Sequence, residues 1–533
     1  MYLSNHINQI FWLAIVTLVL LLSNCSDRSQ YGESSDYEKL GAPDTTAPTI
    51  SSVSPTDNST YNSPATTVAV TFSENMATGS VTTNTSDTTC SGSFQLSSDN
   101  FTTCIKMSGA PSASENVTTF TSTPTDNLSG GTTYKLRITT SATDDASNSL
   151  ASAYTTTNGF TTSPSGSGTI NGSVQMDNGS SLSGVSVIDV LHGSTVATMT
   201  SDYNGDFSQT SLALGMHTLT YSKSGYLDLT MKELLELDNE TLVLETVRLL
   251  PDNCTSGTMS GTITNALTGD NMSGVSLSYT IGLNKWSGFS YFGDTDTSGA
   301  WSLSMSQGWY TIKSVKSGYY YGYHNVYACG NQTKQNNSLS PTLNEGEMRI
   351  VLRWPKTNPV TATDLDSHLS IPNKDDNGTV HLSRDTNVVV SGSACYSCDY
   401  YIYGENDNAT LDKDHKASST PGSPPGDETM TITKVRSGTY SYSVHNLTDR
   451  AGNTDAKKTN LSKSRAKVKV FYCPWGQPVP YCNIEESVVR KRFHAPSDNG
   501  TLWKVFTFST SSSGNGFTRV QEMSYEDTAS DIY

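Results

Sequence analysis

Two pairs of carboxylates in the last third of the chain are the residues best suited to bind a metal ion. Asp364 and Asp366 are two residues apart, as are Asp412 and Asp414. Side chains two apart on a β-strand share a face. If the two segments pair, four carboxylates converge, and calcium, with its preference for oxygen ligands, would neutralise them, with Glu428 as a further ligand. The alternative is that one carboxylate of each pair points outward while the others cap turns.

Two other sets of residues are weaker candidates for metal binding. The first is a group of histidines of transition-metal type, for which no spacing fixes a common site: His368, His381, His415 and His445. The second is Asp202-Tyr-Asn-Gly-Asp206, which has the form of the first half of a calcium loop. It lacks the closing glutamate, so a hairpin turn is the better interpretation.

Aromatic residues concentrate between positions 286 and 323. Exposed aromatic faces suit the recognition of sugars or peptides, and strand alternation would send about half of them into a core instead. The candidate ligand-binding residues are Trp286, Tyr291, Tyr319, Tyr320, Tyr321 and Tyr323. The sequence has no nucleophile elbow, phosphate loop or H-E-x-x-H motif. We therefore expect no catalytic activity; a hydrolase centre within 346–533 is the alternative.

Nine cysteines divide into one near the N-terminus and eight that follow as sequential pairs. The pairs are Cys90 with Cys104, Cys254 with Cys329, Cys395 with Cys398, and Cys473 with Cys482. Disulfides persist in oxidising compartments, so the pairing predicts export. The last four cysteines could also cross-pair, or hold zinc together.

The remaining cysteine, Cys25, follows an apolar run from Ile10 to Leu21 and closes Leu22-Ser23-Asn24-Cys25. The run has the length of a secretory core and is shorter than a spanning helix. The segment resembles a bacterial lipoprotein signal peptide, although Met1 to Gln9 holds no Lys or Arg. The resemblance implies a signal peptide at 1–24, acyl chains on Cys25 (palmitate among them) that hold the protein on a membrane, and a tether at 25–43. Ser26 after the cysteine favours the outer membrane. An ordinary secretory signal or an uncleaved anchor is the alternative.

Composition indicates strands joined by tight turns. The 533 residues include 27 Tyr and 41 Gly, and only 16% are charged; Ser, Thr and Asn are abundant. Tyr and Thr favour strands, and Gly, Asn and Ser favour turns. The net charge of −17 argues against a nucleic-acid partner, because phosphate backbones require a basic face.

An internal repeat follows residue 163. Ser167-Gly-Thr-Ile-Asn-Gly-Ser-Val174 returns as Ser256-Gly-Thr-Met-Ser-Gly-Thr-Ile263, and Lys223-Ser-Gly-Tyr226 returns as Lys316-Ser-Gly-Tyr319. The offsets, 256 − 167 = 89 and 316 − 223 = 93, indicate two copies of one domain. Both copies, 164–250 and 254–341, resemble the carboxypeptidase regulatory-like module. That resemblance implies a transthyretin-like β-sandwich without catalytic residues.

Different motifs flank the repeat on each side. The segment before the repeat, residues 44–163, resembles a bacterial Ig-like domain. The resemblance rests on Asp44-Thr-Thr-Ala-Pro-Thr-Ile50, on the alternating Val68, Val70 and Phe72, and on Gly159-Phe160-Thr161-Thr162. The segment after the repeat, residues 346–533, resembles an uncharacterised β-sandwich domain of bacterial surface proteins. The motifs that carry this resemblance are a D-L-D-x-H strand, an L-D-x-D segment, Gly438–His445 and a W-x-V-F strand.

The sequence thus predicts an all-β protein of tandem β-sandwich domains: one Ig-like, two transthyretin-like and one larger C-terminal sandwich. We expect a lipid-anchored, non-catalytic protein at the outer membrane or cell surface that presents binding or adhesion surfaces to a protein or glycan ligand. A dedicated carbohydrate-binding protein is the alternative, and calcium is the one cofactor that the residues suggest.

Overall fold

The computed structural model describes residues 43–354, 364–372, 379–383, 389–390, 393–394, 401–403, 409–415, 426–446, 460–475, 482, 489–496, 498–510, 516–527 and 532. Regular structure in these residues is almost entirely β-strand, with one short helix, α4 (Asn460–Lys463). In the same residues, no helix combines the length and apolarity needed to cross a bilayer. The predicted all-β class with tandem sandwiches is confirmed.

The first domain holds two small sheets. One has the order β1 (Ile50–Ser54), β2 (Val68–Phe72), β5 (Thr119–Ser122), β4 (Ser112–Ala113). The other contains β3 (Phe94–Ser97), β6 (Thr133–Ile138) and β7 (Tyr154–Thr155), with β8 (Phe160–Thr161) also on β6. Val68, Val70 and Phe72 point into the core between them, as their alternation with polar neighbours predicts.

The second domain pairs a four-stranded sheet with a smaller one. The first sheet runs β11 (Ser194–Thr200), β10 (Ser186–Leu191), β13 (Gly215–Ser222), β14 (Leu229–Leu235). The second runs β12 (Asp206–Ala213), β9 (Ser167–Met176), β15 (Thr241–Val243), and β16 (Val247–Leu249) also pairs with β9.

The third domain has the same arrangement. Its four-stranded sheet runs β19 (Ser290–Asp294), β18 (Ser276–Ile281), β21 (Gly308–Val315), β22 (Gly322–Ala328), and its smaller sheet runs β20 (Ala300–Met305), β17 (Gly257–Asn265), β23 (Asn337–Leu339). In both domains the last strand lies parallel to the first, with Val247 opposite Val174 and Asn337 opposite Ile263. The sequence repeat is therefore a repeat of strand order.

The last domain is a larger sandwich. One sheet runs β29 (Tyr401–Tyr403), β30 (Ala409–Lys413), β31 (Gly426–Ile432), β24 (Met348–Trp354), β33 (Lys467–Tyr472), β34 (Val489–His494). The other runs β26 (Thr379–Leu382), β25 (Asp366–Pro372), β32 (Thr439–His445), β35 (Leu502–Ser509), β36 (Phe517–Ser524), and β27 (Val389–Val390) pairs with β28 (Ser393–Ala394). Large buried side chains, among them Trp354, Trp503 and Phe506, fill the space between the sheets.

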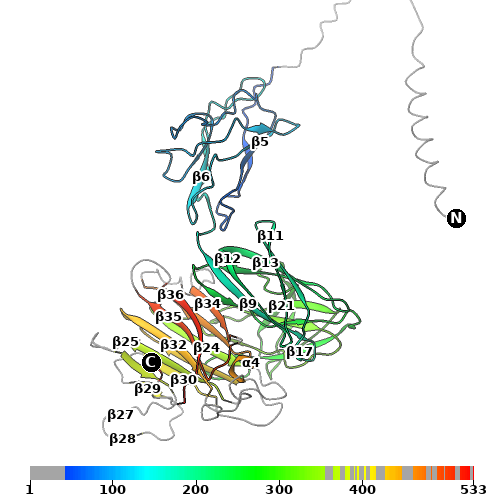
Figure 1. The fold of residues 1–533 in the computed structure, drawn as a ribbon, viewed down its shortest axis with the longest axis vertical. Coiled ribbons are helices and arrows are strands. Elements are labelled where there is room, and N and C mark those ends of the chain that lie inside the picture. The colour runs from blue at the N-terminus through cyan, green and yellow to red at the C-terminus, as the bar shows by residue number, and fades with distance from the viewer. Residues whose placement is uncertain are drawn as a thin grey trace, which may run out of the picture.

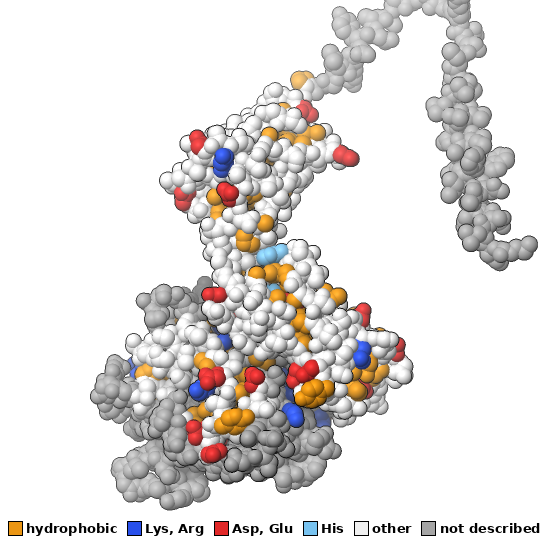
Figure 2. All heavy atoms as spheres, viewed as in Figure 1, with side chains coloured by type: hydrophobic (Ala, Val, Ile, Leu, Met, Phe, Trp, Pro, Cys, Tyr) orange, Lys and Arg blue, Asp and Glu red, His pale blue; other side chains and the backbone are white. Residues whose placement is uncertain are grey.

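The first domain stands apart from a block made by the other three (Figure 1). It touches the second domain through Ser163 Oγ, 3.0 Å from His192 Nε2, and through Tyr61, whose hydroxyl lies 3.5 Å from Glu236. The last domain packs directly on the repeated domains, where Thr429 Oγ1 donates to the carbonyl of Ala266 at 2.6 Å. Backbone and side chains that are neither charged nor hydrophobic cover most of the described surface that faces the viewer in Figure 2.

Candidate functional sites: an acidic cluster and an aromatic surface

Three carboxylates converge at one end of the last sandwich. Asp366 is the first residue of β25, Asp414 follows β30, and Glu428 lies in β31, so the set spans both sheets. One oxygen from each residue lies within 4.8 Å of the other two. Asp366 and Glu428 are buried. The structure thus brings one carboxylate of each predicted pair together with Glu428, and not all four.

Glu428 is positioned by the backbone of the facing sheet. Its neighbour on β24 is Leu352, a core residue, so the carboxylate enters the interior of the sandwich. Oε2 accepts a hydrogen bond from the Ser367 backbone N–H at 2.6 Å. Oε1 has no hydrogen-bond partner among the described residues. Burial, with repulsion from Asp366 and Asp414, raises the pKa of Glu428 well above its ordinary value.

The structure places Asp412 and Asp364 outside this group of three. The pairing of β30 with β31 shifts between Leu411 and Lys413, and a bulge breaks the alternation that would have put Asp412 beside Asp414. Asp412 instead accepts hydrogen bonds from Thr410 Oγ1, at 2.6 Å, and from Thr431 Oγ1. Asp364 is buried just before β25.

Three of the four candidate histidines gather on the sheet that carries β25. His368 Nδ1 lies 2.9 Å from His381 Nε2, and the rings of His368 and His445 are 5.6 Å apart. They do not offer three ligand atoms within 4.8 Å of one another in the described part of the chain. His415 packs edge-on against Trp354 instead. Burial lowers the pKa of His368 well below its usual value, which favours a neutral imidazole.

The aromatic residues between 286 and 323 divide into an exposed group and a buried one. Trp286, 57% exposed, meets Tyr323 edge-on at 4.9 Å, and Arg492 of the last domain lies 4.8 Å over the Trp286 ring. Tyr291, 64% exposed, stands on β19. Tyr320 is buried and stacks on Phe471 of the last domain at 5.3 Å.

The other two tyrosines of this stretch are partly buried. Tyr319 packs against the core of its own domain, and Tyr321 lies under the Lys313 ammonium at 4.1 Å. The predicted ligand-binding set is therefore not one surface. Trp286 and Tyr291 are the exposed members of the set, whereas Tyr323, with Phe289 beside it, is partly buried like Tyr319 and Tyr321.

The second and last domains meet through charged residues that our interpretation of the sequence did not single out. Lys491 Nζ lies 3.1 Å from Glu236, Arg519 Nε lies 2.5 Å from Glu240, and Lys467 pairs with Glu245. The sequence did contain a sign of this contact in Lys467-Val-Lys469, because strand alternation directs both lysines away from the core. Burial alone would raise the pKa of Glu245, but Lys467, His494 and Arg492 lower it to about 2.

A second acidic cluster lies in the first domain and also escaped the sequence analysis. Asp44, Glu74 and Asp144 line a surface hollow of about 590 Å³. Both carboxylate oxygens of Asp144 accept hydrogen bonds from Asn148, at 2.7 and 2.9 Å. The three acids are far apart in the sequence, so no local motif could have predicted that they lie together.

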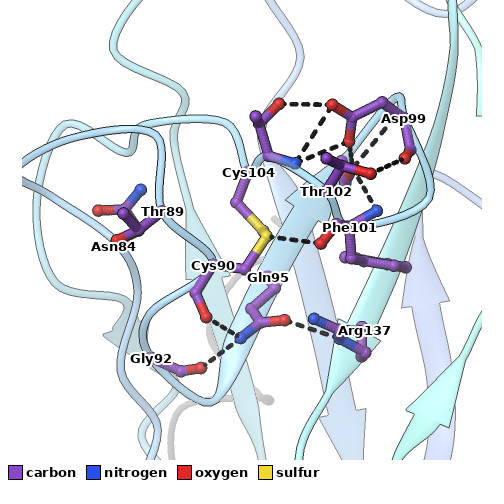
Figure 3. Close-up of a disulfide and its surroundings, with 12 residues drawn as sticks. Asn84, Thr89, Cys90, Gly92, Gln95, Asp99, Phe101, Thr102, Cys104 and Arg137 are labelled. Carbon is purple, nitrogen blue, oxygen red and sulfur yellow. Dashed lines mark hydrogen bonds between the residues drawn. A yellow bond between two sulfur atoms is a disulfide. The ribbon is translucent and has the colours of Figure 1, made fainter.

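The described cysteines are paired within single domains. The structure joins Cys90 to Cys104, Cys254 to Cys329, and Cys473 to Cys482. Figure 3 shows the first pair beside Gln95, whose Nε2 donates to the carbonyls of Cys90 and Gly92 at 2.8 Å. Arg137 in turn donates to Gln95 Oε1 at 2.7 Å. Cys395 and Cys398 lie outside the described residues, as does the whole N-terminal segment with Cys25.

The segment Asp202–Asp206, which has the form of half a calcium loop, is a hairpin turn. Asp202 Oδ1 accepts hydrogen bonds from the backbone N–H groups of Asn204 and Asp206 at 2.8 and 2.9 Å. Asp296 Oδ1 does the same for Ser298 and Ala300 at 2.8 Å. The carboxylates cap turns in both copies, as the hairpin interpretation requires.

Comparison with known proteins identifies the first domain. Residues 44–162 match the family model of the bacterial Ig-like domain. No curated protein matches the chain.

The solved structures that resemble it include a streptococcal ancillary pilin, with 13% identity over 44% of this chain and 80% of that chain and a TM-score of 0.14. The TIE protein of Bacillus anthracis is 14% identical over 76% and 70%, with a TM-score of 0.16. The major pilin subunit of Bacillus cereus is 10% identical over 33% and 99%, with a TM-score of 0.14. Scores this low carry no functional argument.

Proposed function

We propose that this protein is exported and lipid-anchored at the bacterial cell surface, where it displays β-sandwich modules for binding and catalyses no reaction. The observation that carries the proposal is the disulfide pattern. All six described cysteines pair within individual sandwich domains, and such bonds persist in oxidising compartments. The bacterial Ig-like match at 44–162 supports the same location.

The proposed lipid anchor rests on Cys25, the one cysteine without a predicted disulfide partner. Six of the nine cysteines pair in the described residues, and Cys395 and Cys398 form the fourth predicted pair. Cys25 is left without a predicted partner, and it follows an apolar segment that resembles a lipoprotein signal. One acyl chain binds membranes only marginally, whereas two or more anchor stably. The multiple chains that such a signal implies would hold the mature protein on its membrane, and Ser26 favours the outer one. The two repeated domains, with their resemblance to transthyretin-like modules, would act as a rigid platform for the last domain.

Protease treatment of intact cells tests surface display. We expect an added protease to remove epitopes of the last domain from intact cells while a periplasmic marker stays whole. If the epitopes resist until the outer membrane is permeabilised, the protein faces the periplasm, and the proposed display at the surface is wrong.

Carbohydrate recognition is a second candidate function, favoured by the exposed Trp286 beside Tyr323 and Phe289. Aromatic faces of this kind bind the apolar faces of sugars. A glycan array probed with the full chain should then lose its signals on Trp286→Ala. The matched control is Tyr203→Ala, because Tyr203 is 84% exposed and lies in a hairpin turn of the other copy. Equal signals from both variants would remove this candidate.

A further inference from the structure

We propose that Asp366, Asp414 and Glu428 bind one divalent cation of the oxygen-preferring class, calcium first, and that this ion ties the two sheets of the last sandwich together. The proposal goes beyond surface display and does not depend on it. Asp366 comes from the sheet of β25, whereas Asp414 and Glu428 come from the sheet of β30 and β31.

The spacing of the three oxygens fits a single ion. Calcium–oxygen distances are about 2.3–2.6 Å, so two oxygens on one calcium are separated by at most about 5 Å. The three carboxylate oxygens lie within 4.8 Å of one another. Carboxylates from three separate segments are also the type of ligand that hard cations prefer.

Glu428 supplies an independent indication of a ligand. The residue is 1% exposed, and its Oε1 has no hydrogen-bond partner in the described part of the chain. A buried acceptor without a partner costs free energy, and a metal ion at this point would remove the cost. Oε2 is held by the Ser367 N–H at 2.6 Å, so the carboxylate is oriented before any ion binds.

The ammonium of the neighbouring Lys413 is engaged elsewhere. Lys413, next to Asp414 in the chain, places its ammonium 2.7 Å from Asp427. Repulsion from Asp366 and Asp414, added to burial, raises the pKa of Glu428. A proton on Glu428 is therefore the rival occupant, and the experiment has to distinguish a proton from a cation.

Calcium titration of the purified full chain, after removal of metals with a chelator, tests the proposal. We expect calcium to bind with a Kd of about 10⁻⁴–10⁻³ M, the range of extracellular modules. At free calcium 100 times the Kd, the folding equilibrium constant rises about 100-fold, and the melting temperature of the last domain rises with it. Glu428→Gln should weaken this binding at least tenfold and abolish the thermal shift.

The matched control is Asp412→Asn. Asp412 lies two residues from Asp414 and is bonded to Thr410 and Thr431, so this variant should keep the calcium affinity of the unsubstituted protein. Glu428→Gln also removes charge repulsion. We therefore expect it to melt no lower than the unsubstituted protein when calcium is absent, which separates a lost ligand from a misfolded domain.

Three results would overturn the proposal. The first is no calcium-dependent shift of the unsubstituted chain at 10 mM calcium, which leaves a proton on Glu428. The second is an unchanged shift in Glu428→Gln, which places calcium elsewhere, such as at Asp44, Glu74 and Asp144. The third is zinc binding that survives Glu428→Gln but is lost in His368→Gln, with no response to calcium.

Discussion

Glu233 is a titratable residue at the contact between the two repeated domains. It lies on β14 and accepts a hydrogen bond from Asn284 Nδ2 at 2.6 Å, across the boundary between the two repeated domains. Burial, with repulsion from Glu245, raises the pKa of Glu233 to about 7, although Arg492 and Arg519 act in the opposite direction. A carboxyl group whose pKa is raised by folding stabilises the folded protein when it is protonated.

We predict that Glu233→Gln stabilises the protein at pH 8 and has little effect at pH 5. Because the pKa in the folded protein, about 7, exceeds the ordinary 4.5, the contribution of Glu233 to stability is complete below pH 4.5. It is lost as the pH rises through 7. Glutamine keeps the acceptor for Asn284 and never ionises. At pH 8 we expect the free energy of unfolding to rise by about 1–2 kcal/mol, allowing for the partial exposure of Glu233. The melting temperature of the full chain at both pH values checks this prediction.

Glu236→Gln is the control for this prediction. Glu236 contacts Lys491 at 3.1 Å and is partly exposed, so its substitution removes an attraction worth about 0–1 kcal/mol. The melting temperature should stay level or fall. A Glu233→Gln variant that melts lower than the unsubstituted chain at pH 8 would contradict the assigned repulsion.

At the scale of elements, the equivalent hairpins of the two repeated domains depend on glycine. Gly205 has φ +83°, and a Cβ there would lie 2.2 Å from the carbonyl oxygen of Val174. The equivalent Gly299 has φ +71° and an approach of 2.8 Å to the carbonyl oxygen of Ile263. Both glycines fall where a turn must fold against the first strand of its domain.

We predict that Gly205→Ala destabilises the second domain by about 2–4 kcal/mol, because it combines a left-handed backbone with a clash against the main chain. Gly193→Ala is the matched comparison. Gly193 has φ +81° but no atom within 4 Å of its Cβ position, so only the backbone cost of about 1 kcal/mol applies. Hydrogen exchange of β9 and β12 reports the difference, and equal protection in the two variants would refute the close contact.

These turns also show why the repeat was predictable from the sequence. Glycines recurring at fixed positions mark backbone conformations that other residues adopt with difficulty, so their spacing preserves the outline of the domain. The β30 bulge had no such signal. Leu411-Asp412-Lys413-Asp414 reads as regular alternation, and the shift at Asp412 arises from pairing with β31, a partner distant in the chain.

At the scale of the molecule, the packing of the last domain against the repeated domains was the part that the sequence did not predict. Tyr320 looked like a surface aromatic, and it is buried because Phe471 of the last domain covers it. The charged contacts of Lys467, Lys491 and Arg519 likewise join residues more than 220 positions apart. Local periodicity states which face of a strand is polar but not which domain will cover it.

Attachment of acyl chains to Cys25 is the central claim, and metabolic labelling with a palmitate analogue tests it most directly. Cells expressing the unsubstituted chain and cells expressing Cys25→Ala are labelled, fractionated and compared. We predict that the unsubstituted protein carries label and stays with the membranes, whereas the variant carries none and is released or accumulates unprocessed. A Cys25→Ala protein that is processed and retained like the unsubstituted one would contradict the account.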